Sequence, residues 1–290
     1  MFRVLLLLCT VLGLLGIVDG ATGDSIAPDF EITAVVVGLT DTLRGIRSVV
    51  DSLKAMENPK GRRVNLVVHV GQETSLEVDN IGESLAWTHK GDISFVRHLG
   101  GVRLSGPSPM AVGSLWHPTS DSNYGFIVTD ITSVSPLALV WIEGMLTIRH
   151  SGALKDVARR IIGLGLYADR TVATYAKETK EVDFEHPNFT HLHPVPVADA
   201  VFDAAEEVKR AGGKAGEAVL YQHPCIHGGL YFPIPWRELV EFDALVRSPA
   251  MRSQNSLRII DSTIGSWAPG FHKHLTELMW IRGTFLAFPS

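Results

Sequence analysis

The stretch Gly125–Pro136, GFIVTDITSVSP, decides the expected fold because it joins a buried strand, one carboxylate and a helix start. The apolar run Phe126–Val128 predicts a buried strand that ends at Asp130. Ser135-Pro136 then opens a helix over 137–148 that is apolar almost all round, which indicates burial. Ligands of open α/β sheets bind at the carboxyl ends of strands, so Asp130 is placed to hold a metal ion or a sugar hydroxyl. The structural alternative is a strand-end turn residue that bonds backbone amides.

A strand–helix–strand unit precedes this stretch. Apolar runs over 30–37 and 64–70 predict two strands, and apolar residues at helical spacing from Leu43 to Met56 predict the helix between them. Thr40 or Asp41 is the expected N-cap of that helix. Such a unit favours a parallel sheet.

The rest of the chain continues the alternation. Strands are expected at 93–96, 163–167, 219–222 and 284–288, and helices at 110–117, at 153–162, from Asp199, from Pro235 and at 271–282, the last ended by Gly283. Residues 72–82 and 179–196 are expected to be loops. We therefore predict an α/β three-layer domain over 28–290, with a mostly parallel central sheet flanked by helices. Residues from Leu220 onward are expected to form a less regular C-terminal lobe.

Composition and the N-terminus bound the class of protein. The 290 residues are 46% hydrophobic with a net charge of −5 and no basic run, so nucleic acid is not an expected partner. Arg3, the apolar run Val4–Val18 and Asp19 describe a signal peptide over residues 1–20 that is short for a membrane span. We expect a protein of the secretory-pathway lumen (ER or Golgi) or a secreted one; an uncleaved membrane anchor is the alternative. Asn188 begins an N-glycosylation sequon, which agrees with exposure of the chain to the lumen.

Histidine and cysteine offer a second kind of chemistry. With the signal removed, Cys225 is the remaining cysteine of the two, so no intrachain disulfide is expected. His223, Cys225 and His227 alternate along one extended segment, which permits a metal site. No second Cys/His pair at zinc spacing accompanies them, so a packed turn is the alternative. His186, His191 and His193 cluster in the proline-rich loop. They could bind a ligand, but histidines in such loops often bind none.

Charged residues near aromatic ones are the remaining candidates. Glu238, in Trp236-Arg237-Glu238, has the chemistry of a general base, or it pairs with Arg237 or a lysine on a solvated face. Glu277 is a similar carboxylate, and Arg282 either complements its helix dipole or contacts a phosphate. The sequence has no GxSxG elbow, P-loop or GxGxxG, so hydrolase and dehydrogenase readings lack their usual motifs.

Taken together, these residues resemble the nucleotide-sugar glycosyltransferases of family 2, in their eukaryotic branch of fungi, plants and algae. The likeness lies in four places in the same order: Phe30–Leu53 with Arg62–Leu66; Trp116–Asp121 with Tyr124 and Val134–Pro136; Pro224-Cys225, Gly228, Leu230–Pro233 and Trp236–Glu238; and Ser266-Trp267, Glu277-Leu278, Arg282-Gly283 and Pro289.

The resemblance implies a GT-A fold, a nucleotide-diphosphate sugar (UDP or GDP) as donor, Mn²⁺ or Mg²⁺, and a glycan or glycoprotein acceptor. Gly38, Thr40 and Asp41 would then lie near the nucleotide, Asp130 on the metal, and Glu238 would be the acceptor-side base. Relatives have Glu-Asp-Asp where this chain has Thr129-Asp130-Ile131, so one acid matches.

A second departure follows the Pro-Cys motif. Relatives carry Ser-Trp after it and this chain Ile226-His227, which makes His227 a candidate replacement ligand. The rival hypothesis is therefore a catalytically degenerate relative that binds a glycan or a partner. A metal hydrolase using His223, Cys225 and His227 is a third.

Overall fold

The computed structural model describes residues 29–40, 42–75, 86–150, 159–166, 171–175, 192–196, 218–221, 224–225, 227–253 and 267–289. The expected signal peptide, the sequon at Asn188, the helix expected from Asp199, and Asp41, His186, His191 and His223 lie outside these residues. No helix within them is both long enough and apolar enough to span a bilayer.

A single mixed sheet organises the domain, in the order β3-β2-β1-β4-β9-β5-β10-β8. Its strands are β1 (Glu31–Val37), β2 (Val64–Val70), β3 (Ile93–Arg97), β4 (Asn123–Thr129), β5 (Ile161–Gly165), β8 (Ala218–Tyr221), β9 (Gly228–Tyr231) and β10 (Phe285–Pro289). The pairs β1–β2, β2–β3, β1–β4 and β5–β10 are parallel, whereas β9 runs antiparallel to β4 and β5, and β8 to β10. The predicted α/β fold with a mostly parallel central sheet is confirmed.

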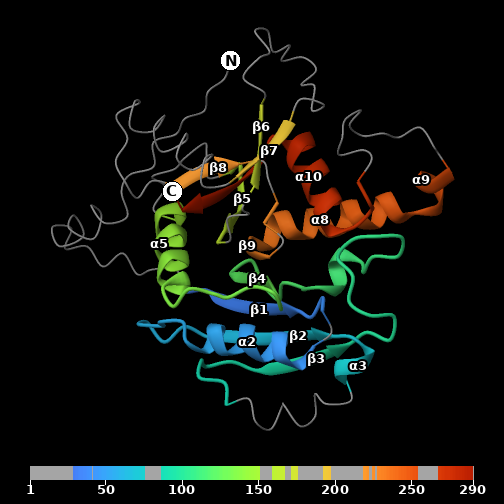
Figure 1. Cartoon of the computed structure of the whole chain (residues 1–290). Helices are drawn as coiled ribbons and strands as arrows, with labels where there is room; N and C mark the ends of the chain where they lie inside the picture. Colours follow the sequence, from blue (N-terminus) through green and yellow to red (C-terminus); the bar gives the residue numbers. More distant parts are fainter. Residues whose placement is uncertain are drawn as a thin grey trace.

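Helices cover both faces of the sheet (Figure 1). On one face, α2 (Leu43–Lys54) and α5 (Ala138–His150) pack in a core with alternate residues of β1 and β4. On the other face lie α8 (Pro233–Arg247), α10 (Phe271–Arg282) and the segment 102–116. Ala34 and Val36 face the first core and Val35 and Val37 the second, which explains the unbroken apolar run.

Local signals fix the ends of the longer helices. α2 buries the stripe Ile46, Val49, Val50 and Leu53, and its N-cap is Thr42, whose hydroxyl accepts the Gly45 N–H at 3.3 Å. The expected N-cap, Thr40 or Asp41, was therefore wrong by one or two residues. Gly283 ends α10 as predicted, in a left-handed conformation (φ 58°) that glycine adopts without strain.

The C-terminal part is more regular than expected. It supplies β8, β9 and β10 to the sheet and α8 and α10 to one face of the sheet (Figure 1). β9 lies in the middle of the sheet, between β4 and β5. Its Gly229 is required there, because an added Cβ would lie 2.7 Å from the carbonyl oxygen of Cys225.

Four other expectations were wrong in part. Residues 110–117 form no helix beyond the 3-10 turn η2 (Val112–Ser114), and Ile161-Ile162 belong to β5 rather than to a helix. Within the expected loops lie α3 (Gln72–Ser75) and β7 (Leu192–Pro196), which pairs with β6 (Thr171–Tyr175) in a separate two-stranded sheet. A short helix, α9 (Pro249–Ser253), follows α8.

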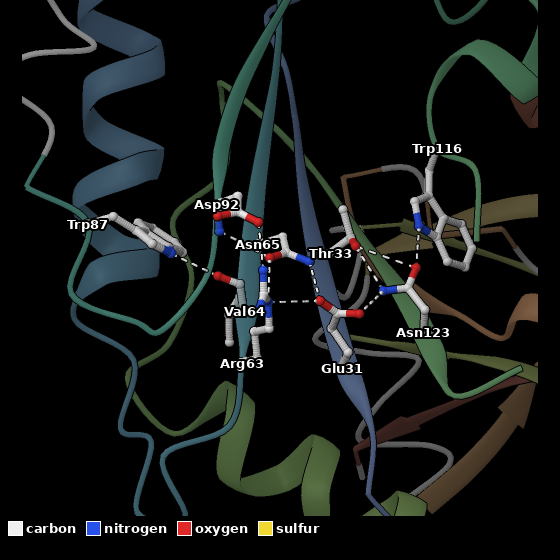
Figure 2. A network of polar contacts seen from close by, with 9 residues as sticks. All are labelled: Glu31, Thr33, Arg63, Val64, Asn65, Trp87, Asp92, Trp116 and Asn123. Carbon is white, nitrogen blue, oxygen red and sulfur yellow. Dashed lines mark hydrogen bonds and ion pairs between the residues drawn. The ribbon is translucent and has the colours of Figure 1, made fainter. Parts of the chain in front are cut away.

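A polar network ties together the amino ends of the strands (Figure 2). Asn123 donates to Glu31 Oε2 at 3.3 Å and to Thr33 Oγ1 at 3.1 Å, and it accepts the Trp116 indole N–H at 3.1 Å. Arg63 pairs with Glu31 at 3.1 Å on the other side. These charges balance one another across β1, β2 and β4. The network therefore stabilises the amino edge of the sheet.

Candidate functional site

The candidate site lies at the carboxyl edge of the parallel strands. Val37 at the end of β1 is level with His69 of β2 and with Thr129 of β4. The order reverses here, since β2 and β3 extend the sheet on one side of β1 and β4 on the other. Such switch points are where ligands of open α/β sheets bind.

The β1–α2 turn, Gly38–Thr40, crosses this edge. The Gly38 N–H donates to the His69 carbonyl at 2.9 Å. A Cβ at position 38 would lie only 2.9 Å from that oxygen, so the close approach requires glycine. Gly38 is thus fixed by backbone packing, whereas its predicted contact with a nucleotide stays a prediction.

Asp130 holds the turn from across the edge. Its Oδ1 accepts the Leu39 N–H at 3.0 Å, and its Oδ2 accepts the Thr40 N–H at 2.9 Å and the Thr40 hydroxyl at 2.5 Å. Its own N–H donates to the Val37 carbonyl at 3.1 Å, and the residue is 5% exposed. Asp130 therefore lies where the sequence predicted, with its carboxylate bonded to backbone amides.

Two threonines and His227 form a hydrogen-bonded chain beside Asp130. The Thr132 hydroxyl donates to the His227 carbonyl at 2.8 Å, so its oxygen accepts the Thr129 hydroxyl at 3.0 Å. The remaining contact, 3.0 Å from Thr129 Oγ1 to His227 Nδ1, then requires a proton on Nδ1. The chain thus fixes the tautomer of His227 and joins it to the end of β4.

An open pocket of about 220 Å³ adjoins this chain on the α5 side of the sheet. Thr132, Ser133 and Ser135 give it hydroxyl groups, while Trp141 and Phe126 supply aromatic surface. The full lining is Phe126, Thr132, Ser133, Val134, Ser135, Leu137, Ala138, Trp141, Leu166 and Gly228. A mostly apolar pocket with a few polar groups is suited to a small ligand.

A histidine pair lies at the same edge and was missed by the sequence reasoning. His69 Nδ1 is 2.8 Å from His98 Nε2, and His69 Nε2 is 2.9 Å from the Leu115 carbonyl oxygen. Burial lowers the pKa of His69 to about 4, with His98 adding to the effect and the Leu115 bond opposing it. Burial also lowers the pKa of His98. A histidine within the apolar run of β2 was the available signal.

The structure pairs two of the candidate charged residues with each other. Glu238 of α8 forms an ion pair with Arg282 of α10, with side chains 38% and 58% exposed. The predicted partner Arg237 instead contacts Asp121. Glu277 is buried, and burial raises its pKa against the opposing effects of Lys273 and His274.

Cys225 is buried and donates its thiol to the Gly228 carbonyl at 3.0 Å. The Tyr231 hydroxyl bonds the Cys225 carbonyl at 2.6 Å. These contacts agree with the packed-turn alternative for this segment, since they place Cys225 inside the second core.

The residues at the edge do not make a complete metal site. Within the part of the chain that the structure describes, no three His, Cys, Asp or Glu side chains are close enough to hold one ion. Three acceptor positions of Asp130 are already occupied. A divalent ion usually takes one or two carboxylates besides substrate phosphates and water. Among the described residues no further donors of this kind accompany Asp130 and His227, and the metal-binding roles of these two residues stay predictions.

Comparisons with known proteins find likeness to solved structures. No family model matches the chain, and no curated protein does. Among solved structures 14 chains match. One is the crystal structure of S. aureus TarS 1–349, at 10% identity and a TM-score of 0.37, over 90% of this chain. The match spans 57% of the length of that structure.

Proposed function

We propose that this chain is a GT-A-type glycosyltransferase that moves a sugar from a nucleotide diphosphate to a glycan or glycoprotein acceptor in the secretory pathway. The observation that carries the proposal is the carboxyl edge at the switch point. There the β1–α2 turn, bonded to Asp130 through Leu39 and Thr40, lies on one side of β4, and a pocket with hydroxyl and indole groups lies on the other. An elongated ligand with a charged and a sugar portion suits such an edge.

The charged portion would lie by the β1–α2 turn. Arg44 and Arg47 are exposed on the first turns of α2, and Gly45 between them lies against Asp130. Their guanidinium groups favour a diphosphate. The sugar portion would lie by Thr132 and Trp141.

Transfer also needs a base for the acceptor hydroxyl. Glu238 stays the predicted base, and it could act only after its pair with Arg282 opens. The chemistry of the proposed reaction is therefore better supported for donor binding than for proton removal.

Donor binding and turnover test the proposal. Purified protein is titrated calorimetrically with UDP, GDP and their common sugar conjugates, and release of free nucleotide is followed with each acceptor class. We expect saturable binding of one nucleotide and its sugar. The Arg44→Ala/Arg47→Ala double variant should bind at least tenfold more weakly, whereas Arg103→Ala, an exposed arginine of another segment, should bind normally. Absence of binding and turnover with every donor would refute the proposal.

A second candidate is a catalytically degenerate relative that binds a glycan without transferring sugar. The carboxylate of Asp130, which already accepts three hydrogen bonds, and the paired carboxylate of Glu238 favour it. It predicts glycan binding that EDTA leaves unchanged, in protein that releases no nucleotide from any donor. Measurable turnover would decide against this candidate.

A further inference from the structure

We infer that Asp130 is a structural residue and not a metal ligand, so that nucleotide binding at this edge needs no divalent ion. Its carboxylate holds the β1–α2 turn through hydrogen bonds from Leu39 and Thr40, and we call this set of bonds the clasp. The second half of this inference rests on the proposed function, whereas the first half stands on the hydrogen bonds of Asp130 alone.

The Asp130 carboxylate has little acceptor capacity left for a metal ion. An ionised carboxylate offers about four lone-pair positions. The Leu39 N–H, the Thr40 N–H and the Thr40 hydroxyl occupy three of them, at 3.0, 2.9 and 2.5 Å. A bound ion would displace at least one donor or compete beside it in a side chain that is 5% exposed. Displaced amides would then be left without a partner, which is costly.

The two residues next to Asp130 are not acids. Thr129 and Ile131 flank Asp130 where further acids would complete a metal motif. The Thr129 hydroxyl is engaged with Thr132 and His227, and the Ile131 side chain is apolar and 63% exposed. Neither neighbour offers a ligand that a hard cation such as Mn²⁺ or Mg²⁺ prefers.

The negative charge of Asp130 lies close to α2. A Cβ added at Gly45 in the first turn of α2 would lie 3.3 Å from Asp130 Oδ2, so the carboxylate lies beside the amino end of this helix. There its negative charge complements the helix dipole without any metal. The amino end of α2 therefore offsets the negative charge of Asp130 without a cation.

The test compares Asp130→Asn, Asp130→Ala and the control Asp51→Asn, an exposed carboxylate of α2. Melting temperature, Mn²⁺ binding by electron paramagnetic resonance with and without UDP, and the Kd of UDP in Mn²⁺ and in EDTA are measured for each. We expect Asp130→Ala to melt on the order of 5 °C lower than the control. Wild-type protein should bind UDP within twofold in Mn²⁺ and EDTA. If Asp130→Ala does not fold, Asp130→Asn and Thr40→Val, each of which removes part of the clasp, give the stability readout.

Two results would overturn the inference. One is a tenfold or greater tightening of UDP by Mn²⁺ in wild type that Asp130→Asn abolishes, which would leave the proposed function intact. The other is an unchanged melting temperature in all three variants that weaken the clasp. If no UDP binds at all, the proposed function fails, and the melting temperatures together with Mn²⁺ binding by the protein alone still decide the role of Asp130.

Discussion

The Nδ1 atom of His274 lies 2.5 Å from Oδ1 of Asp243, and both side chains are buried between α8 and α10. Asp243 also accepts the Val112 N–H at 3.0 Å and the Arg247 guanidinium at 2.8 Å. Arg247 in turn donates to the carbonyls of Pro109 and Met110. One buried carboxylate therefore fixes the segment that leads from β3 to β4.

Replacing this carboxylate should be costly. Asp243→Ala should lower the free energy of unfolding by about 3 kcal/mol, because removing one partner leaves buried donors and charge uncompensated. Burial raises the pKa of Asp243, but bonds from His274, Arg247 and the Val112 amide outweigh it, so the net pKa is lowered. A lowered pKa means that the stabilisation is present above the usual carboxyl range and is lost as the pH falls through and below it.

Urea unfolding at pH 7 and at stepwise lower pH measures both effects. The exposed control Asp51→Asn should change stability by less than about 0.5 kcal/mol. An Asp243→Ala protein as stable as wild type at pH 7 would show that the network does not hold the segment.

The same network explains where sequence reasoning about the fold failed. Residues 110–117 have helical spacing, yet the Val112 amide bonds Asp243 and the Trp116 carbonyl bonds the Trp236 indole. These partners lie more than 100 residues away, so tertiary contacts override local preference. β9 was missed for a related reason. Its sequence, GGLY, has little strand signal, and the strand forms because its backbone pairs with β4 and β5 on either side. By contrast, 64–70 and 271–282 were predicted at their observed bounds, because apolar pattern and caps are local.

For the site, the sequence placed Asp130 at the end of β4, since a strand followed by a turn is a local pattern. It could not reveal that backbone amides about 90 residues away donate hydrogen bonds to the carboxylate, or that Arg282 pairs with Glu238. The strand order at the switch point brings the first set together, and the packing of α8 on α10 the second. Side-chain pairs of this kind depend on tertiary structure.

Asn123 should contribute strongly to the stability of the fold at the amino edge of the sheet (Figure 2). It is 1% exposed, and it bonds Trp116, Thr33 and Glu31 through both ends of its amide. Asn123→Leu should therefore reduce the free energy of unfolding by roughly 2 kcal/mol, since it leaves buried polar groups unsatisfied. Thermal unfolding measures the loss. Asn58→Leu is the comparison at a half-buried turn, and an effect at Asn123 no larger than at Asn58 would contradict the assignment.

Glu277 should oppose stability at neutral pH. Its Oε2 has no hydrogen-bond partner among the described residues, and burial raises its pKa. Because the folded pKa is raised, its favourable contribution is present below the ordinary glutamate pKa and is lost as the pH rises through the folded value. Glu277→Met should raise the melting temperature at pH 7 by about 2 °C and flatten this dependence. Glu241→Met, on the exposed side of α8, should do neither; a lower melting temperature in Glu277→Met would refute the prediction.

His69 should make the domain sensitive to mild acid. Its pKa falls from 6.5 to about 4, chiefly because burial disfavours the charged ring. Between these values the unfolded chain binds a proton that the folded protein does not, so stability falls as the pH drops from about 6.5 toward 4. At about 1.4 kcal/mol per pKa unit, the full effect is roughly 3 kcal/mol. Urea unfolding between pH 4.5 and 7.5 should show this slope in wild type and in the control His117→Gln, an exposed histidine, and should show much less of it in His69→Gln. Equal slopes in wild type and His69→Gln would mean that the burial of His69 does not set the acid limit of the fold.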